Sequence, residues 1–443
     1  MSGKMNCCTA DPPENGSSTV DMKIFPTLDT IIPILSFQFK PSNLTTLDLL
    51  AILICLLAGH FLRKLINYGY LQFRFMFIDD LIKDLSSADT PPQSDGSHPN
   101  GWMPVAEKEQ LATGAVLKVR ALGRDFVLMR DSIGKVHAMD PYCPHNGAHL
   151  GGGDVVKIRG EDCIRCPFHE WSFRAEDGVC VDVPYAKDRK SPKGSNLKMW
   201  PCMEANGFIY IWFHNGGESA DWVPETLEDI KLGRISYCGR FENIMDCEPY
   251  AVVENTADYY HFFSVHHKPS FIFTIVKSFP FYNKVEEAYT NFSWNTCEPT
   301  QSHKAEAEVQ FNVRIRNWAL VRAPLKIVFQ GPYALTTHVE TNFLGLTFKM
   351  ELVVGLIPVR FNKVKHILRL YCGNGFLSQL MGRLYLVQLF SNVQSDCDIW
   401  QNMIRWRKPT FLKEEKDIAD CNRWYSKFYD GANKNLIESG NDR

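Results

Sequence analysis

The chain has 443 residues, which is long enough for two folded domains with additional segments. Its 48 Lys and Arg residues nearly balance its 50 Asp and Glu residues, so the charge shows no sign of a nucleic-acid partner. The 14 cysteines are scattered along the chain, which excludes a dense secreted disulfide framework and favours a reducing compartment.

An apolar run near the N-terminus predicts a membrane anchor over residues 44–63, after a tail of residues 1–43. Within "LLAILICLLAGHFLRK" no charged side chain occurs before Arg63 and Lys64. A bilayer takes about 20 apolar residues, so this shorter run fits a thin membrane such as the endoplasmic reticulum; a buried core helix is the alternative. The two bases predict a single-pass anchor that leaves the bulk of the chain in the cytosol.

Two domains are expected after the anchor. Residues 64–100 predict a juxtamembrane segment and a linker, because "DLSSADTPPQSDGSHPNG" is rich in turn-forming residues and has no periodicity. Residues 101–217 contain short β-rich runs separated by glycines, which predicts a small antiparallel all-β domain. Residues 218–443 then form the second domain.

Two loops in the first domain each offer a cysteine and a histidine. "CPHNGAHLGGG" supplies Cys143 and His145, and "CPFHEWSF" supplies Cys166 and His169. A zinc site is one alternative, but zinc sites usually take like ligands from each loop. One cysteine and one histidine from each loop suit a [2Fe-2S] cluster in which two thiolates hold one iron and two imidazoles hold the other.

The second domain carries a candidate mononuclear iron site. "VVENTADYYHFFSVHHKPSF" contains His261 and His266, which can reach one metal only if a helix distorts or ends between them. Two histidines and a distant carboxylate make the facial triad of non-haem Fe(II) oxygenases; an aromatic helix with surface histidines is the alternative. A late amphipathic helix, "YLVQLFSNVQSDCDIWQNM", offers Asp396 or Asp398 as the carboxylate.

The β-rich runs between residues 273 and 359 are heavy in aromatic and aliphatic residues and place few charges where they would face inward. A sheet of this kind curved over a helix encloses an apolar cavity. We therefore expect a neutral lipid, such as a sterol, as the substrate.

The two cluster loops resemble those of Rieske oxygenases. The respiratory Rieske proteins have an extra cysteine in each loop, where this chain has Ala148 and Phe168. The resemblance implies an α+β chain in which the Rieske domain precedes a helix-grip catalytic domain, a curved antiparallel sheet over helices. It selects Asp396 as the third iron ligand, with Asp398 as the alternative.

The resemblance also implies how electrons travel. In this family a residue matching Asp258 links a Rieske histidine of one subunit to an iron-binding histidine of its neighbour in a homotrimer, which here would be His169 and His261. The sequence has no glycine-rich nucleotide loop, so the two electrons from NAD(P)H are expected through a separate reductase.

The anchor, the linker, "ENTADYYHFFSVHH" and "SDCDIW" together resemble the animal cholesterol 7-desaturases, the Neverland-type enzymes of steroid hormone biosynthesis. The implied reaction converts cholesterol to 7-dehydrocholesterol with O₂ and two electrons. Two alternatives stay open. One is a membrane-anchored Rieske hydroxylase of another sterol or lipid, and the other is a Rieske electron carrier without oxygenase activity.

Overall fold

The computed structural model describes residues 80–84, 98–187, 192–266, 285–315, 318–343, 345–404 and 409–429. All of them belong to one compact unit. The tail at residues 1–43 and the predicted anchor at residues 44–63 lie outside the described residues. No helix within the described ranges is long and apolar enough to span a membrane.

The first half of the described chain is built from three small antiparallel sheets, as the sequence predicts. Their strand orders are β10-β5-β4-β3, β11-β12-β2 and β6-β7-β8-β9. Two short 3-10 helices, η4 (Lys108–Gln110) and η5 (Leu150–Gly152), interrupt them. The strands are β2 (Gly101–Glu107), β3 (Val116–Ala121), β4 (Arg124–Arg130), β5 (Val136–Met139), β6 (Asp154–Ile158), β7 (Glu161–Arg165), β8 (Ser172–Arg174), β9 (Cys180–Asp182), β10 (Met199–Trp200), β11 (Cys202–Ala205) and β12 (Phe208–Phe213).

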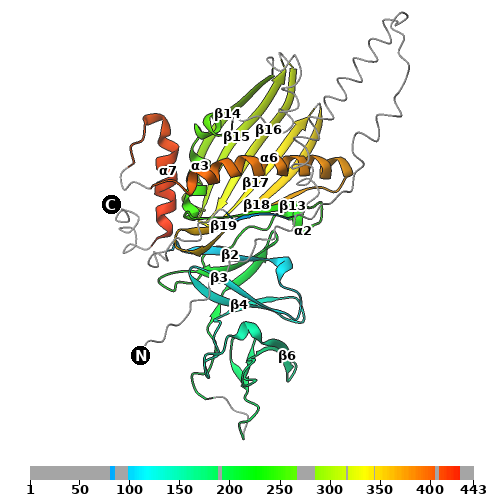
Figure 1. The fold of residues 1–443 in the computed structure, drawn as a ribbon, viewed down its shortest axis with the longest axis vertical. Helices are drawn as coiled ribbons and strands as arrows, with labels where there is room; N and C mark the ends of the chain where they lie inside the picture. The colour runs from blue at the N-terminus through cyan, green and yellow to red at the C-terminus, as the bar shows by residue number, and fades with distance from the viewer. Residues whose placement is uncertain are drawn as a thin grey trace, which may run out of the picture. The chain divides into compact units, whose positions relative to one another are not determined.

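The second half is a large sheet with helices (Figure 1). Its eight strands follow the order β1-β13-β19-β18-β17-β16-β15-β14, antiparallel except for the pair β1 and β13. The strand bounds are β1 (Asp80–Asp84), β13 (Ile235–Met245), β14 (Val285–Thr296), β15 (Lys304–Ile315), β16 (Trp318–Gln330), β17 (Ala334–Phe343), β18 (Leu346–Arg360) and β19 (Lys363–Gly373). The helices are α2 (Glu228–Lys231), α3 (Pro249–Ala257), α4 (His261–Ser264), α6 (Phe376–Trp400), α7 (Lys416–Tyr425) and the 3-10 turns η7 (Lys413–Glu415) and η8 (Ser426–Phe428).

Strand β1 is a feature that sequence reasoning did not anticipate. The segment 64–100 was expected to be a juxtamembrane stretch and a linker, yet residues 80–84 pair with Arg240 to Ile244 of β13 and extend the sheet at one edge. Five residues are too few for a periodic pattern to stand out in a sequence. The chain therefore joins the second sheet before it builds the first domain.

One face of the large sheet packs against helices, and this face is almost entirely apolar. Helix α6 crosses the strands in Figure 1, and α3, α6 and α7 share a hydrophobic core with the sheet. Because side chains alternate along a strand, strand register identifies the residues on this face. From β15 to β19 they are apolar apart from Thr337, Thr341 and His366.

Helix α6 lies very close to the sheet at Gly382. A Cβ atom added there would lie 2.8 Å from Sγ of Cys238 and 2.9 Å from Sγ of Cys372, one on β13 and one on β19. Only glycine therefore permits this approach without a shift of the packed atoms. Further along the helix, Leu386, Cys397 and Trp400 are buried against the same core.

The opposite face of β18 and β19 packs against β2 and β12 of the first half. Val353, Ile357 and Ile367 join Trp102 and Phe208 in one buried cluster. Gly355 allows this contact, since a Cβ atom there would lie 2.9 Å from the Phe208 ring.

A buried ionic network lies within the same interface. Arg369 of β19 donates to Glu107 of β2 at 2.5 Å and to Glu109 at 2.8 Å. Arg240 of β13 lies 2.8 Å from Glu107 and 2.5 Å from Glu242. Burial raises the pKa of Glu107, and the two arginines oppose that shift. Because loss of one partner from such a network costs about 3 to 5 kcal/mol, the network holds the two halves in one register.

Candidate metal centres

The two predicted cluster loops lie side by side at one end of the described unit. The first follows β5 and the second follows β7. Each closes on itself through backbone hydrogen bonds: Cys143 N donates to Ala148 O at 2.9 Å, and Cys166 N donates to Trp171 O at 2.8 Å. Gly147 has a φ of +73°, the left-handed conformation that allows the first loop to turn.

The two loops place side chains of the same type next to each other. The Cys143 and Cys166 thiols are both buried and interact with one another. The rings of His145 and His169 lie 4.7 Å apart, and both are more exposed than the cysteines. Each loop supplies one cysteine and one histidine, but the fold pairs cysteine with cysteine and histidine with histidine. That pairing is what a [2Fe-2S] cluster with one thiolate-bound and one imidazole-bound iron requires.

Two further observations fit a bound cluster. Nδ1 of His169 is buried and has no hydrogen-bond partner among the described residues, so it is available as a ligand. Burial, together with the neighbouring Cys166 thiol, raises the pKa of Cys143 to about 11. A thiol in this environment stays protonated at neutral pH until metal binding displaces the proton.

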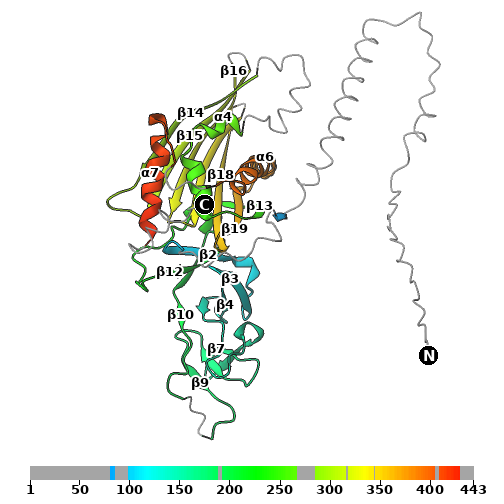
Figure 2. The same cartoon turned by 60° about the vertical axis from the view of Figure 1, so that its left-hand side comes forward.

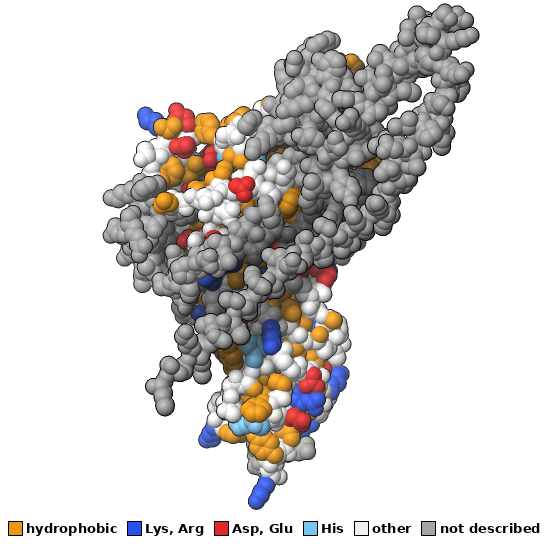
Figure 3. All heavy atoms as spheres, viewed as in Figure 1, with side chains coloured by type: hydrophobic (Ala, Val, Ile, Leu, Met, Phe, Trp, Pro, Cys, Tyr) orange, Lys and Arg blue, Asp and Glu red, His pale blue; other side chains and the backbone are white. Residues whose placement is uncertain are grey.

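Sequence reasoning missed the aromatic residues around His145 and His169, whose exposed side of the domain we call the histidine edge. Trp171 stacks on His145 with 4.5 Å between ring centroids, and its Nε1 donates to the hydroxyl of Tyr185 at 2.8 Å. Tyr142, Phe168 and Tyr185 are exposed. Figure 3 shows histidine among hydrophobic side chains on the surface of this end. The one available signal was the position of Trp171 inside the second cluster motif.

The second centre is built where a helix breaks. Helix α3 ends at Ala257, Asp258 leaves the helical conformation, and a new short helix begins at His261. The sequence predicted that a helix must distort or end between His261 and His266 for both to reach one metal, and α4 ends at Ser264, between the two histidines. Tyr259 ties the segment between α3 and α4 to the sheet, because its hydroxyl donates to the Tyr289 carbonyl of β14 at 2.8 Å.

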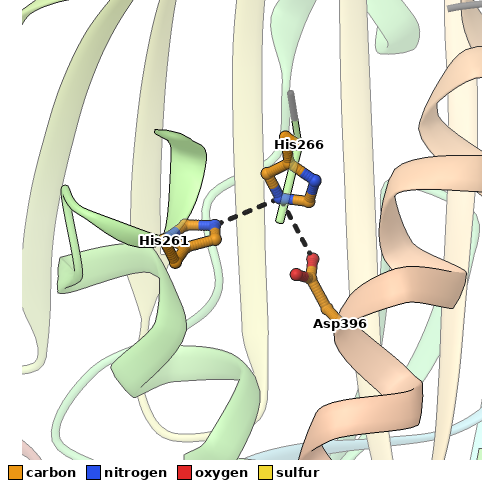
Figure 4. A group of neighbouring side chains, drawn as sticks. All are labelled: His261, His266 and Asp396. Carbon is orange, nitrogen blue, oxygen red and sulfur yellow. Dashed lines mark hydrogen bonds and ion pairs between the residues drawn. The ribbon is translucent and has the colours of Figure 1, made fainter. Parts of the chain in front are cut away.

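His261, His266 and Asp396 converge on one point (Figure 4). The Nε2 atoms of the histidines lie 3.1 Å apart, and Nε2 of His266 lies 3.3 Å from Oδ2 of Asp396. Ligands about 2.1 to 2.2 Å from one ion and at right angles are about 3.0 Å apart, so these separations suit neighbouring positions around a single metal. No other group of three His, Cys, Asp or Glu side chains in the described ranges converges in this way.

Burial and hydrogen bonding prepare the three side chains as ligands. All three are buried, and Oδ1 of Asp396 lacks a hydrogen-bond partner within the described part of the chain. Nδ1 of His261 donates to the Asp258 carbonyl at 2.5 Å, which leaves its Nε2 lone pair facing the metal position. Burial also lowers the pKa of His261, which favours the neutral imidazole that metals bind. The alternative carboxylate, Asp398, is exposed.

Asp258 contacts His261 within its own chain, but its carboxylate does not contact the ring. The backbone carbonyl meets the ring, while Oδ1 accepts from the backbone N–H groups of Tyr260 at 2.9 Å and His261 at 3.3 Å. The carboxylate therefore shapes the turn between α3 and α4. One residue that sequence reasoning did not assign also reaches the site, because Nδ2 of Asn255 lies 3.2 Å from Nε2 of His261.

Aromatic rings form a wall beside the mononuclear site. Phe262 stacks on Tyr289 of β14 at 4.8 Å, and Tyr289 lies 5.1 Å from Phe311 of β15. Tyr259 stacks on Phe292 at 5.1 Å. Figure 2 shows α4 beside these two strands. The space next to the metal ligands is therefore bounded by apolar rings.

Comparison with known proteins agrees with both centres. Residues 101–201 match the Rieske [2Fe-2S] domain, and residues 211–429 match the 3-Ketosteroid 9alpha-hydroxylase C-terminal domain. Cholesterol 7-desaturase nvd 1 of Ciona intestinalis is 30% identical over 333 residues, covering 75% of this chain and 68% of its own. Cholesterol 7-desaturase nvd 2 of the same organism is 28% identical over 378 residues, covering 83% and 80%.

The chain belongs to the Rieske non-haem iron oxygenases. A solved structure of dicamba monooxygenase bound to dicamba shares the fold, with a TM-score of 0.53, 18% identity and coverage of 77% of this chain and 99% of that one. As a Rieske oxygenase, the protein is an oxidoreductase that acts with O₂ and holds a [2Fe-2S] cluster and a mononuclear iron. Cys143, His145, Cys166 and His169 are placed to hold the cluster, and His261, His266 and Asp396 to hold the iron.

We expect Cys166→Ser to abolish the visible absorption of the Rieske cluster, because a hydroxyl replaces a thiolate poorly as a cluster ligand. Cys163→Ser is the matched control, since Cys163 is equally buried three positions earlier and its thiol donates to Glu161 O at 3.6 Å. Absorption spectra of the two purified variants decide the assignment. A normal Rieske spectrum from Cys166→Ser would show that Cys166 is not a ligand.

We expect Asp396→Ala to lower the iron content from about three to about two atoms per chain, because the cluster stays and the mononuclear iron is lost. Asp398→Ala should keep about three, because that side chain points to solvent. Iron determination beside the cluster spectrum checks both. Retention of the third iron by Asp396→Ala, or its loss from Asp398→Ala, would contradict the choice of carboxylate.

Proposed function

We propose that this Rieske oxygenase is a cholesterol 7-desaturase of steroid hormone biosynthesis. The reaction joins cholesterol, O₂, two electrons and two protons and yields 7-dehydrocholesterol and two waters. The C7 and C8 hydrogens leave the sterol, a C7=C8 double bond forms, and O₂ is reduced. The mononuclear iron, when bound, supplies O₂ activation.

One observation carries the choice of substrate class: from β15 to β19, the sheet face toward the iron ligands has no charged residue. Neither an acidic nor a cationic substrate would find an ion-pair partner on the inner face from β15 to β19. A neutral, largely apolar molecule fits this surface because its burial needs no compensating charge. The relatives named cholesterol 7-desaturase support a sterol within that class.

Apolar side chains on facing surfaces remain partly exposed near the metal ligands. Leu325 and Ile327 of β16 face the helices, and Leu389, Phe390 and Val393 of α6 face the sheet, yet none is fully buried. Side chains that face each other across a filled core are normally buried. We propose that these five residues line the space that takes the sterol rings.

Two other functions are alternatives. A hydroxylase of another sterol or lipid would use the same metal centres, and only the product separates it from a desaturase. An electron carrier without oxygenase activity is disfavoured, because it has no use for the buried convergence of His261, His266 and Asp396.

Electron supply is part of the proposal. A separate reductase would pass electrons from NAD(P)H to the cluster, and one relative is described as an oxygenase component. Within one chain, the cluster loops and α4 lie at opposite ends of the described unit (Figures 1 and 2). We propose that a homotrimer brings the histidine edge of one subunit to the iron site of the next, with Asp258 between His169 and His261.

The proposed location is the endoplasmic reticulum membrane, with both iron centres on the cytosolic side. The apolar run at residues 44–63 and the bases that follow it support this location. Cholesterol partitions into bilayers, so a membrane location would give the enzyme its substrate directly.

The decisive experiment supplies the full chain with cholesterol, O₂, NADPH and a Rieske-type reductase. We expect 7-dehydrocholesterol, recognised by the ultraviolet absorption of its conjugated diene and by its mass, and none from Asp396→Ala. If a hydroxylated sterol is the main product, the enzyme is a hydroxylase and not a desaturase. Absence of any sterol product from protein with both metals bound would refute the sterol proposal.

We expect Asp258→Asn to leave both metals bound but to slow electron delivery by about two orders of magnitude or more. Asn keeps an oxygen that can accept from the Tyr260 and His261 backbone N–H groups. It cannot accept from two imidazoles with its remaining atoms, whereas a carboxylate can. Reoxidation of the pre-reduced cluster after addition of O₂ and cholesterol measures the rate, with Asp398→Asn as control. Wild-type reoxidation in Asp258→Asn would exclude the bridge.

A further inference from the structure

A small polar cluster interrupts the apolar core under α6. Asn243 of β13 and His366 of β19 are cross-strand partners on the face that packs against the helices. Both are buried, with Asn243 completely so. Nε2 of Gln394 on α6 donates to Oδ1 of Asn243. Three segments that are far apart in the sequence therefore place their polar groups together.

Each member of this cluster has a hydrogen-bonding atom left over. Nδ2 of Asn243, Oε1 of Gln394 and Nδ1 of His366 are buried and have no hydrogen-bond partner among the residues that the structure describes. Buried polar atoms nearly always form hydrogen bonds with protein, water or ligand. Three unpaired atoms in one cluster therefore indicate that a water or a ligand binds there. Burial lowers the pKa of His366 to about 4, so its ring is neutral at physiological pH.

The leftover atoms match a hydroxyl group. An amide nitrogen is a donor, an amide oxygen is an acceptor, and a neutral imidazole nitrogen is either one. A hydroxyl donates one hydrogen bond and accepts up to two, so its count of donors and acceptors matches the three atoms. A carboxylate would leave the Gln394 oxygen unpaired, and an ammonium would leave the Asn243 nitrogen unpaired.

The cluster also lies at a suitable place relative to the iron ligands. Gln394 and Asp396 are two residues apart on α6, which is about 3 Å along the helix axis and about 200° around it. The Phe241 ring lies 5.9 Å from the His366 ring of the cluster and 5.4 Å from the Phe390 ring of the apolar lining. Gln394 and Phe390 are partly exposed, whereas the three leftover atoms are buried.

We propose that Asn243, Gln394 and His366 bind the 3-hydroxyl group of the sterol and thereby set which carbon faces the mononuclear iron. The inference deepens the proposed function and rests on it. Cholesterol has one polar group, the hydroxyl of ring A, and the C7 position lies in the adjoining ring B. Because ring B adjoins ring A, a hydroxyl held at one place would fix how far C7 lies along the sterol from that place.

The test compares cholesterol with cholest-5-ene, which lacks only the hydroxyl. We expect the full-length enzyme to favour cholesterol in kcat/KM and in equilibrium binding by about 10- to 100-fold, as a satisfied buried hydrogen-bonding group commonly gives. In the double variant Asn243→Leu and Gln394→Met this preference should fall to about threefold or less.

Thr341→Val is the matched control, because Thr341 also has a buried hydroxyl oxygen without a partner in the described chain and lies on the same sheet face. It should keep the wild-type preference, and all variants should keep the Rieske spectrum and the third iron. If the double variant still prefers cholesterol as the wild type does, or if Thr341→Val loses the preference, the hydroxyl site is wrong and a buried water fills the cluster. A wild-type enzyme that acts on neither sterol and binds neither refutes the proposed function itself.

Discussion

The catalytic half of this protein depends on the close approach of α6 to its sheet. At Gly382 the helix backbone lies against the sulfur atoms of Cys238 and Cys372, where a Cβ atom would collide. An α-helix is stiff, so this contact, together with the buried side chains of Leu386, Cys397 and Trp400, determines where the last turns of α6 lie. Asp396 is in those turns, and it reaches the two histidines only because the helix is held in this position.

The large sheet serves a different purpose on each face. The face toward α6 is nearly free of polar groups, which suits an apolar substrate. Each polar side chain on this face is therefore a candidate for a specific role. The other face binds the Rieske domain through an apolar cluster and the buried pair of Arg369 and Glu107. A buried ionic network is a weak source of net stability but a strong constraint on geometry, because any other register leaves a charge unpaired.

The Rieske loops divide their ligands between interior and surface. The cysteines are buried in the domain core, whereas the histidines face outward beside exposed aromatic rings. The imidazole-bound iron is therefore the part of the cluster that a second subunit could approach. Figure 2 shows α4, which carries His261, at the opposite end of the described unit from β7, which precedes one cluster loop; this separation supports the proposed trimer.

The sequence by itself indicated the two domain types, and it predicted the four cluster residues and the two histidines of the second motif as ligands. Each of these signals is local, since the residues lie within one loop or one short segment whose spacing already implies a shared site. Sequence reasoning also expected a helix to distort or end between His261 and His266, because a regular helix cannot turn both histidines to one metal.

Only the tertiary structure decided which side chains meet from distant segments. Asp396 is buried against His266 while Asp398 is exposed, a difference that follows from how α6 lies on the sheet. The structure also places the Asp258 carbonyl, rather than its carboxylate, on the His261 ring of the same chain. The cluster of Asn243, His366 and Gln394 has no sequence motif, because two adjacent strands and a helix from separate parts of the chain build it. Spacing in the sequence can indicate a site whose residues lie within one short segment. A site formed across the core exists only once packing has brought its segments together.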